Sequence, residues 1–239
     1  SLSLPSVNLV DSITTGLRVK ATVFDFDVSL SYLYARDSLP LVDRVVVTGS
    51  PPNVNVAADL LFPREHIIGA DCAGSLFGVG VWAEAALFAP EKVTLTTDLS
   101  SIGYGVQQST ALDSTPYVKF VVGGDYTFPG NVYLNGQYLH GFVQERGASN
   151  LEDYFVFALD WKLLDDKLTI SPLGVVVEIK NWKDIPNNYG ILAAPSVSFV
   201  PVDNAQLTIG LHLIQGTPST TFGALSGNNE VFLQARYSF

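Results

Sequence analysis

The feature that most constrains this fold is an alternation of apolar and polar residues that recurs in about eleven short segments of the chain. The closing segment, Glu230 to Phe239, shows it most completely. One side of this segment carries Val231, Leu233, Ala235, Tyr237 and Phe239. Successive side chains of a β-strand point to opposite faces, so the pattern predicts strands that are apolar on one face and mostly polar on the other.

The connections between these segments alternate in length. Short connections are expected at 25–27, 77–78 and 129–131, and long ones at 35–65, 89–115 and 143–153. Two short strands are predicted inside 35–65, and 89–115 is predicted to hold either a short helix or a hairpin. Pro172 predicts a bulge within the strand at 168–179, because proline cannot donate to a sheet ladder. Turns at one edge and loops at the other indicate an antiparallel meander.

Composition indicates where such a meander would reside. Hydrophobic residues make up 47% of the 239 residues and charged residues only 15%, against about 25% charged in an average protein. Mean hydropathy is +0.27, yet no apolar run approaches the roughly 18 residues of a transmembrane helix. Apolar residues spread over alternate positions of many segments are typical of membrane barrels. The net charge of −10 argues against a nucleic-acid partner.

The closing strand, with its terminal Phe239 and Tyr237 two places earlier, resembles the last strand of bacterial outer-membrane β-barrels. The segment from Phe62 to Phe88, with Gly-Ala-Asp, a tight Gly turn and Trp-Ala-Glu, is similar to porin-like proteins of proteobacteria. The resemblance implies an all-β, antiparallel up-and-down transmembrane barrel of about 12 strands, with short periplasmic turns and long extracellular loops. It also implies the outer membrane as location and recognition of the closing strand by the barrel-assembly machinery.

The segment count is odd, whereas bacterial single-chain barrels usually have an even number of strands. Residues 1–11 could supply a twelfth strand of one domain spanning 1–239. Alternatively, this chain is the C-terminal portion of a larger barrel, since it contains neither a Met nor a signal sequence. The sequence leaves both alternatives open.

The polar positions opposite the apolar stripes are predicted to face the barrel interior, because a Lys or Arg on the lipid face costs about 2–4 kcal/mol near the midplane. Whether they pair and fill the interior or line a pore stays open. These lumen-lining candidates are Arg18, Lys20, Asp71, Glu84, Lys119, Asp125, Asp160, Lys162, Glu178, Lys180 and Arg236.

Aromatic residues gather near strand ends on the apolar side, as in the girdles at the two membrane interfaces. A soluble aromatic core is the alternative. The candidate interface aromatics are Tyr32, Tyr34, Tyr126, Phe128, Tyr138, Phe155, Trp161, Tyr237 and Phe239.

Catalytic and metal-binding signals are sparse. His66, His140 and His212 lack the spacing of a metal site, and Cys72 is a single thiol. His140 resembles, distantly, the catalytic His of the outer-membrane phospholipase, but the Ser-containing motif expected after it is replaced by Gly141-Phe142. No metal, no cofactor and no catalytic residue are expected.

The sequence therefore favours a porin-like channel that passes small solutes by diffusion, in contact with outer-membrane lipid. The alternatives are a barrel that acts as an adhesin or as a scaffold for a partner protein, a barrel-embedded lipid hydrolase, and a soluble β-sandwich. The solute and any homo-oligomer are not specified.

Overall fold

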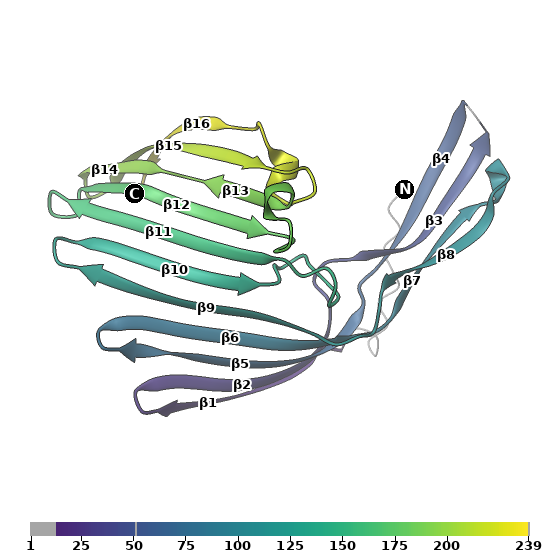
Figure 1. Cartoon of the computed structure of the whole chain (residues 1–239), viewed down its shortest axis with the longest axis horizontal. Helices are drawn as coiled ribbons and strands as arrows, with labels where there is room; N and C mark the ends of the chain where they lie inside the picture. The colour runs from purple at the N-terminus through teal and green to yellow at the C-terminus, as the bar shows by residue number, and fades with distance from the viewer. Residues whose placement is uncertain (1–12, 51, 239) are drawn as a thin grey trace.

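The computed structural model describes residues 13–50 and 52–238, which are almost entirely β-structure. Most strands join one large antiparallel sheet, and a smaller four-stranded sheet extends from its end (Figure 1). The large sheet contains β1 (Thr15–Val23), β2 (Phe26–Arg36), β5 (Arg64–Leu76), β6 (Val79–Pro90), β9 (Tyr117–Phe128), β10 (Val132–His140), β11 (Asp153–Leu163), β12 (Leu168–Ile179), β13 (Tyr189–Ala193), β14 (Ser196–Val202), β15 (Ala205–Gly216) and β16 (Glu230–Tyr237).

The order of the large sheet follows the chain, with each strand antiparallel to its neighbours. β13 and β14 lie end to end, because both pair with β12 on one side and β15 on the other. The 12 strands of this sheet therefore occupy 12 − 1 = 11 positions, the number of segments predicted from the alternation. Pro195 lies in the gap between β13 and β14, where its lack of an N–H interrupts the ladder.

Tight turns join the strands at one end of the sheet. The residue pairs Phe24-Asp25 and Phe77-Gly78 both have positive φ, with values of 50° and 64° and of 54° and 82°. Two consecutive positive φ angles match the right-handed twist of a hairpin. The first turn therefore lies at 24–25 rather than at 25–27, and Phe26 already belongs to β2.

The bulge predicted at Pro172 is confirmed. Leu159 pairs with Leu173 and Trp161 with Ile170, so Asp160 faces two residues, Ser171 and Pro172. The alternation of β12 shifts by one residue there, which keeps its apolar side chains on the same face of the sheet on both sides of the bulge.

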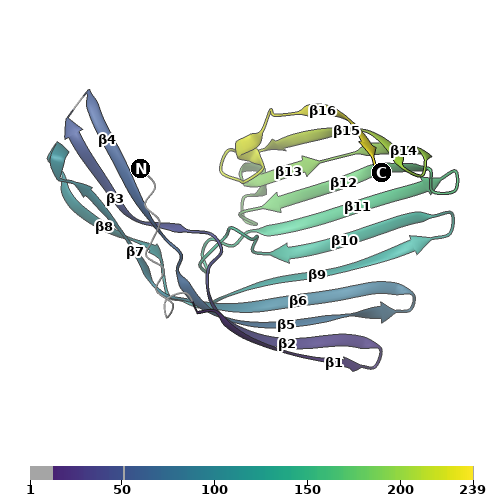
Figure 2. The ribbon, with the colours of Figure 1, turned by 180° about the vertical axis from the view of Figure 1, so that it is seen from behind.

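The smaller sheet, here called the wing, is formed within the two longest connections. It contains β3 (Leu41–Ser50), β4 (Asn53–Leu61), β7 (Val93–Leu99) and β8 (Gly105–Leu112). The two strands predicted within 35–65 are confirmed, and 89–115 forms a hairpin with one 3₁₀ turn, Ser100–Ile102. A parallel pairing of β3 with β7 joins the two hairpins. Figure 2 shows the wing projecting from the end of the large sheet that carries the long connections.

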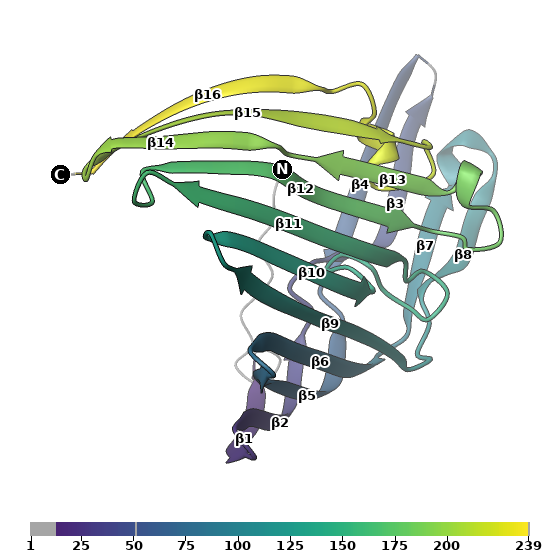
Figure 3. The ribbon, with the colours of Figure 1, turned by 60° about the vertical axis from the view of Figure 1, so that its left-hand side comes forward.

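The large sheet is curved and open between β1 and β16, which lie at opposite edges (Figure 3). Among the described residues these two strands are not paired, so the closed barrel predicted from the sequence is not observed in this sheet. Both edge strands begin at the end with the long connections, since Thr15 pairs with Tyr34 and Glu230 with His212. They are therefore parallel to each other.

The fold buries little apolar surface. The chain exposes 15458 Å², whereas a soluble monomer of 25.8 kDa exposes about 10,500 Å². Buried apolar side chains gather where the large sheet meets the wing and the loops, and they include Ala35, Val93, Leu112, Tyr117 and Tyr154. The described residues contain no helix that is long and apolar enough to cross a membrane.

Candidate functional site: the polar wall

One face of the large sheet, here called the polar wall, carries the charged residues predicted to line a lumen. The pairing register connects them from strand to strand: Lys20 pairs with Ser29, Ser29 with Asp71, and Asp71 with Glu84. The same face includes Arg18, Lys20, Asp71, Glu84, Lys119, Asp125, Asp160, Lys162, Glu178 and Arg236, and Lys180 directly follows the end of β12.

A cross-strand network neutralises the charges at the β1 side of the polar wall. Arg18 Nη2 lies 2.7 Å from Asp71 Oδ2, and Arg18 Nε donates to Ser29 Oγ at 2.8 Å. Ser29 Oγ also donates to Asp71. This part of the wall behaves as a paired polar surface rather than as a set of free charges.

A second network crosses β9 and β10 and contains residues that were not among the predicted site residues. Tyr133 OH donates to Asp125 Oδ2 at 3.0 Å, and Gln137 Nε2 donates to Asn135 Oδ1 at 3.1 Å. The sequence feature that could have identified these residues is the row of uncharged polar side chains on one face of the segment 132–142. Their side chains extend the hydrogen-bonding surface of the wall beyond its charged groups.

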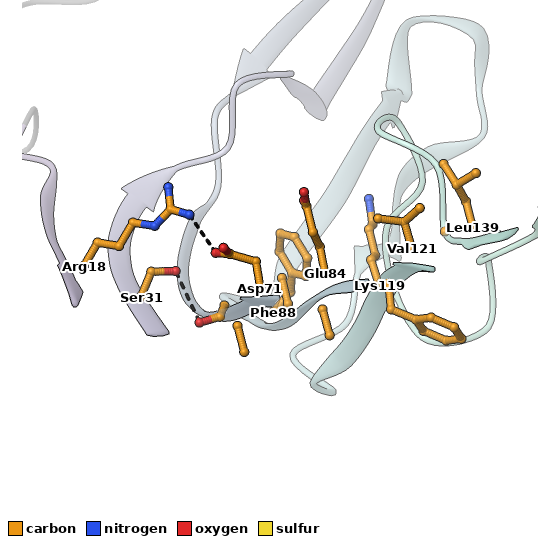
Figure 4. A pocket seen from close by; sticks show the side chains of 14 residues that line it. Arg18, Ser31, Asp71, Glu84, Phe88, Lys119, Val121 and Leu139 are labelled. Carbon is orange, nitrogen blue, oxygen red and sulfur yellow. Dashed lines mark hydrogen bonds and ion pairs between the residues drawn. The ribbon is translucent and has the colours of Figure 1, made fainter. Parts of the chain in front are cut away.

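A hollow of about 470 Å³ on the polar wall lies across β1, β2, β5, β6, β9 and β10. Figure 4 shows Glu84 and Lys119 projecting into it. Lys119 Nζ donates to the carbonyl oxygen of Phe142 at 2.7 Å and lies 5.4 Å from the centre of the Phe88 ring. Glu84 makes no hydrogen bond or ion pair with any described residue. The hollow therefore offers both signs of charge to a solute.

The loop at residues 141–152 is fixed at the rim of this hollow. Arg146 Nη2 donates to Asp37 Oδ1 at 2.8 Å, and Arg146 Nε donates to Asp37 Oδ2. Burial by itself would raise the pKa of Asp37, but the hydrogen bond from Arg146, a backbone N–H of Leu39 and the Arg146 charge together hold that pKa below its usual value. The loop thus narrows the opening through which a solute could reach the polar wall from the end with the long connections.

The opposite face of the large sheet is apolar and carries the predicted interface aromatics that fall within the described residues. Tyr32, Tyr34, Tyr138 and Phe155 lie toward the end with the long connections. Tyr126, Phe128, Trp161 and Tyr237 lie toward the tight turns. Phe239 lies outside the described residues. The two groups thus occupy the two ends of the strands, with aliphatic side chains between them.

Two of the three histidines lie on this apolar face, near the end with the long connections. His140 Nδ1 is 2.8 Å from Asp153 Oδ1, which also accepts a 2.6 Å hydrogen bond from Tyr138 OH, while Trp182 Nε1 donates to Asp153. His66 Nδ1 is 2.8 Å from Tyr32 OH. No Ser, Thr or Cys of the described chain contacts His140 through a hydrogen bond, so the nucleophile that a hydrolase needs is not observed beside it.

Neither a metal site nor similarity to a known protein assigns a function to these residues. In the described part of the chain, no three His, Cys, Asp or Glu residues gather as metal ligands would. No family model matches the chain, and no curated protein is significantly similar to it in sequence. The functional argument therefore rests on the two faces of the large sheet.

Proposed function

We propose that the large sheet is the wall of an outer-membrane β-barrel and that its polar wall lines a passage for the passive diffusion of small solutes. The apolar face then lies against lipid, and the wing and the long loops lie on the extracellular side. The tight turns and the end of β16 lie on the periplasmic side, where the closing strand meets the barrel-assembly machinery.

The observation that carries this proposal is the exposed apolar face. Large aliphatic side chains remain open to solvent across the whole sheet, for example Val19 at 62%, Val122 at 46% and Leu233 at 78%. No layer of described protein covers them, and burial of such surface is worth about 25 cal/mol per Å². Lipid would supply the missing apolar contact, with aromatic residues at its two boundaries.

Strand lengths support the same arrangement. Transmembrane β-strands need about 9–11 residues, and here β10 has 9 residues, β2 and β11 have 11, and β5 has 13. The extra length of the longer strands, together with the wing, would extend beyond the lipid. A soluble sandwich would instead cover this apolar face with a second sheet.

The charge pattern of the polar wall favours a passage without strong ion selectivity. Its eleven predicted lining residues comprise six cations and five carboxylates, 6 + 5 = 11. Asp71 and Arg18 neutralise each other, and Asp125 and Asp160 accept hydrogen bonds from neighbours. Rings of one sign of charge, which produce strong selectivity in channels, are not formed by these residues.

Conductance across a planar bilayer tests the proposal. We expect stepwise, weakly ion-selective conductance after insertion of the full chain, and swelling of proteoliposomes in small sugars. A chain that inserts into the bilayer but leaves it sealed would contradict the diffusion role.

The wing favours a second candidate function, attachment to a partner protein as an adhesin or scaffold. One face of β4 carries Val54, Val56 and Leu60, which are all exposed, at 66% for Val56. Membrane insertion without conductance, together with partner binding that is lost when Val56 and Leu60 are changed to Ser, would support this role over the channel.

A further inference from the structure

The connection between β15 and β16, residues 217–229 and here called the flap, is folded against the polar wall at the end with the long connections. It contains the 3₁₀ turn Gly223–Leu225. Thr220 is buried, and its Oγ1 donates toward the carbonyl oxygens of Thr217, at 2.9 Å, and Tyr189. A Cβ at Gly190 would lie 2.6 Å from Glu178 Oε2 and 2.9 Å from Thr220 Oγ1. Glycine at this position thus leaves the space in which the flap docks.

One fully buried carboxylate fixes the flap. Glu178, at the end of β12, is 0% exposed, and its two oxygens accept the backbone N–H groups of Thr221 at 2.6 Å and Phe222 at 2.9 Å. The flap is therefore attached to the wall by two hydrogen bonds to a buried carboxyl group rather than by apolar contact alone.

A second carboxylate, that of Glu152, lies beside the first. Glu152 Oε1 is 3.0 Å from Lys180 Nζ, and its side chain is 12% exposed. Glu152 Oε2 is buried, and no donor among the described residues reaches it. Lys180 Nζ also donates to the carbonyl oxygen of Ser219 in the flap, at 2.7 Å. A proton on Glu152 would supply the donor that this arrangement lacks.

We infer that Glu152 and Glu178 form a proton-operated latch, which holds the flap on the polar wall when Glu152 is protonated and releases it when Glu152 ionises. In the closed state, the Glu152 O–H donates to the Glu178 carboxylate. Ionisation sends that proton to solvent and leaves two carboxylates side by side, with Lys180 as the cation that pairs with Glu152. Their repulsion, together with the burial of a second charge, raises the free energy of the docked state relative to a state in which the flap has left and water reaches both carboxylates.

The other charged and titratable groups around the latch already have partners within the described residues. Glu145 accepts the backbone N–H of Glu152 at 2.9 Å and the hydroxyl of Tyr154. Phe222 packs edge-on against the Tyr154 ring, with centroids 6.4 Å apart. His212 pairs with Glu230 at 2.6 Å where the flap joins β16. Glu152 is thus the group whose ionisation adds an unmatched charge next to Glu178.

The pH range of the latch follows from the environment of Glu152. Burial, followed by the adjacent Glu178, raises the pKa of Glu152 from 4.5 to about 7, against the opposing effect of Lys180. An acid whose pKa is raised by docking favours the docked state while it is protonated. The flap is therefore held most firmly at acidic pH, and docking weakens as the pH rises from 4.5 through about 7.

Hydrogen exchange of the flap amides tests the latch without any need for conductance. After correction for intrinsic exchange, we expect peptides covering 217–226 to exchange about tenfold faster at pH 8 than at pH 6 in the full chain in micelles. Equal protection of wild-type flap peptides at the two pH values would overturn the proposal, whatever the conductance experiments show.

Three variants test whether Glu152 causes the pH dependence of flap protection. Glu152→Gln places an amide donor next to Glu178, so we expect the flap to stay protected at both pH values. His212→Gln is the matched control, because histidine side chains also change charge in this range, and it should keep the wild-type response. Glu84→Gln, elsewhere on the polar wall, should also keep it. A Glu152→Gln flap that loosens as the wild type does would contradict the latch.

Discussion

Arg146 joins two segments that lie 109 positions apart in the sequence. Its guanidinium forms a fork with the Asp37 carboxylate, and Nη1 donates to the carbonyl oxygen of Gln144 at 2.8 Å. The side chains of Arg146 and Asp37 are only 11% and 12% exposed. Removal of one partner from a pair as buried as this destabilises the protein more than removal of one partner from a surface ion pair, because it leaves an uncompensated buried charge.

We expect Arg146→Ala to lower the free energy of unfolding by about 3 kcal/mol, measured by urea unfolding in micelles. Arg146→Lys should recover part of this loss, since a lysine keeps the charge but not the fork. Because the pKa of Asp37 is held below its ordinary 3.8, the contribution is present above that pH and is lost as the pH falls through the folded-state value. A loss that does not depend on pH would contradict an ionic origin.

The elements of the sheet follow directly from the alternation along the chain. The segment predicted at 168–179 coincides with β12, Leu168–Ile179, including its bulge at Pro172. The sequence predicts the first turn at 25–27, but the turn lies at 24–25, because Phe24 adopts a positive φ that is unusual for this residue type. Residues 89–115 are polar and have no clear period, so their sequence does not distinguish a helix from a hairpin. In the structure they form a hairpin whose first strand, β7, pairs with β3.

Two neighbouring residues of β9 distinguish a strand in lipid from a strand in water. Val122 lies on the apolar face, whereas Val121 lies on the polar wall, opposite Glu84 and Leu139. We expect Val122→Lys to destabilise the protein folded in a bilayer by about 2–4 kcal/mol, and Val121→Lys to be nearly neutral because the new ammonium faces Glu84. Denaturant titration in liposomes measures both. Equal tolerance of the two changes would indicate that the apolar face does not contact lipid.

At the scale of the whole molecule, the parallel direction of β1 and β16 constrains how a barrel could close. Direct pairing of these edges would form a parallel ladder, whereas antiparallel closure needs an odd number of further strands between them. The odd number of strand positions expected from the sequence is therefore also a property of the described sheet, with 11 positions.

Cysteine cross-linking tests antiparallel closure in a Cys72→Ala background. If further strands separate the edges, Val19→Cys with Leu233→Cys should not form a disulfide within one chain, because the two Cα atoms would be more than about 7 Å apart. Val19→Cys with Leu30→Cys is the matched control, since these residues are direct partners in β1 and β2, and it should cross-link. An efficient Val19–Leu233 disulfide would indicate direct closure.

The sequence by itself determined the strands, the two faces and the two ends of the sheet, because the period of two and the turn residues act over a few neighbouring positions. Arg18, Asp71 and Glu84 could be assigned to one face in this way. Only the tertiary structure decided which of them are paired, that the long connections build a wing, and that Arg146 meets Asp37 and Glu178 meets the flap. Those contacts join residues far apart in the chain, and local alternation carries no information about which distant loop lies against which strand end.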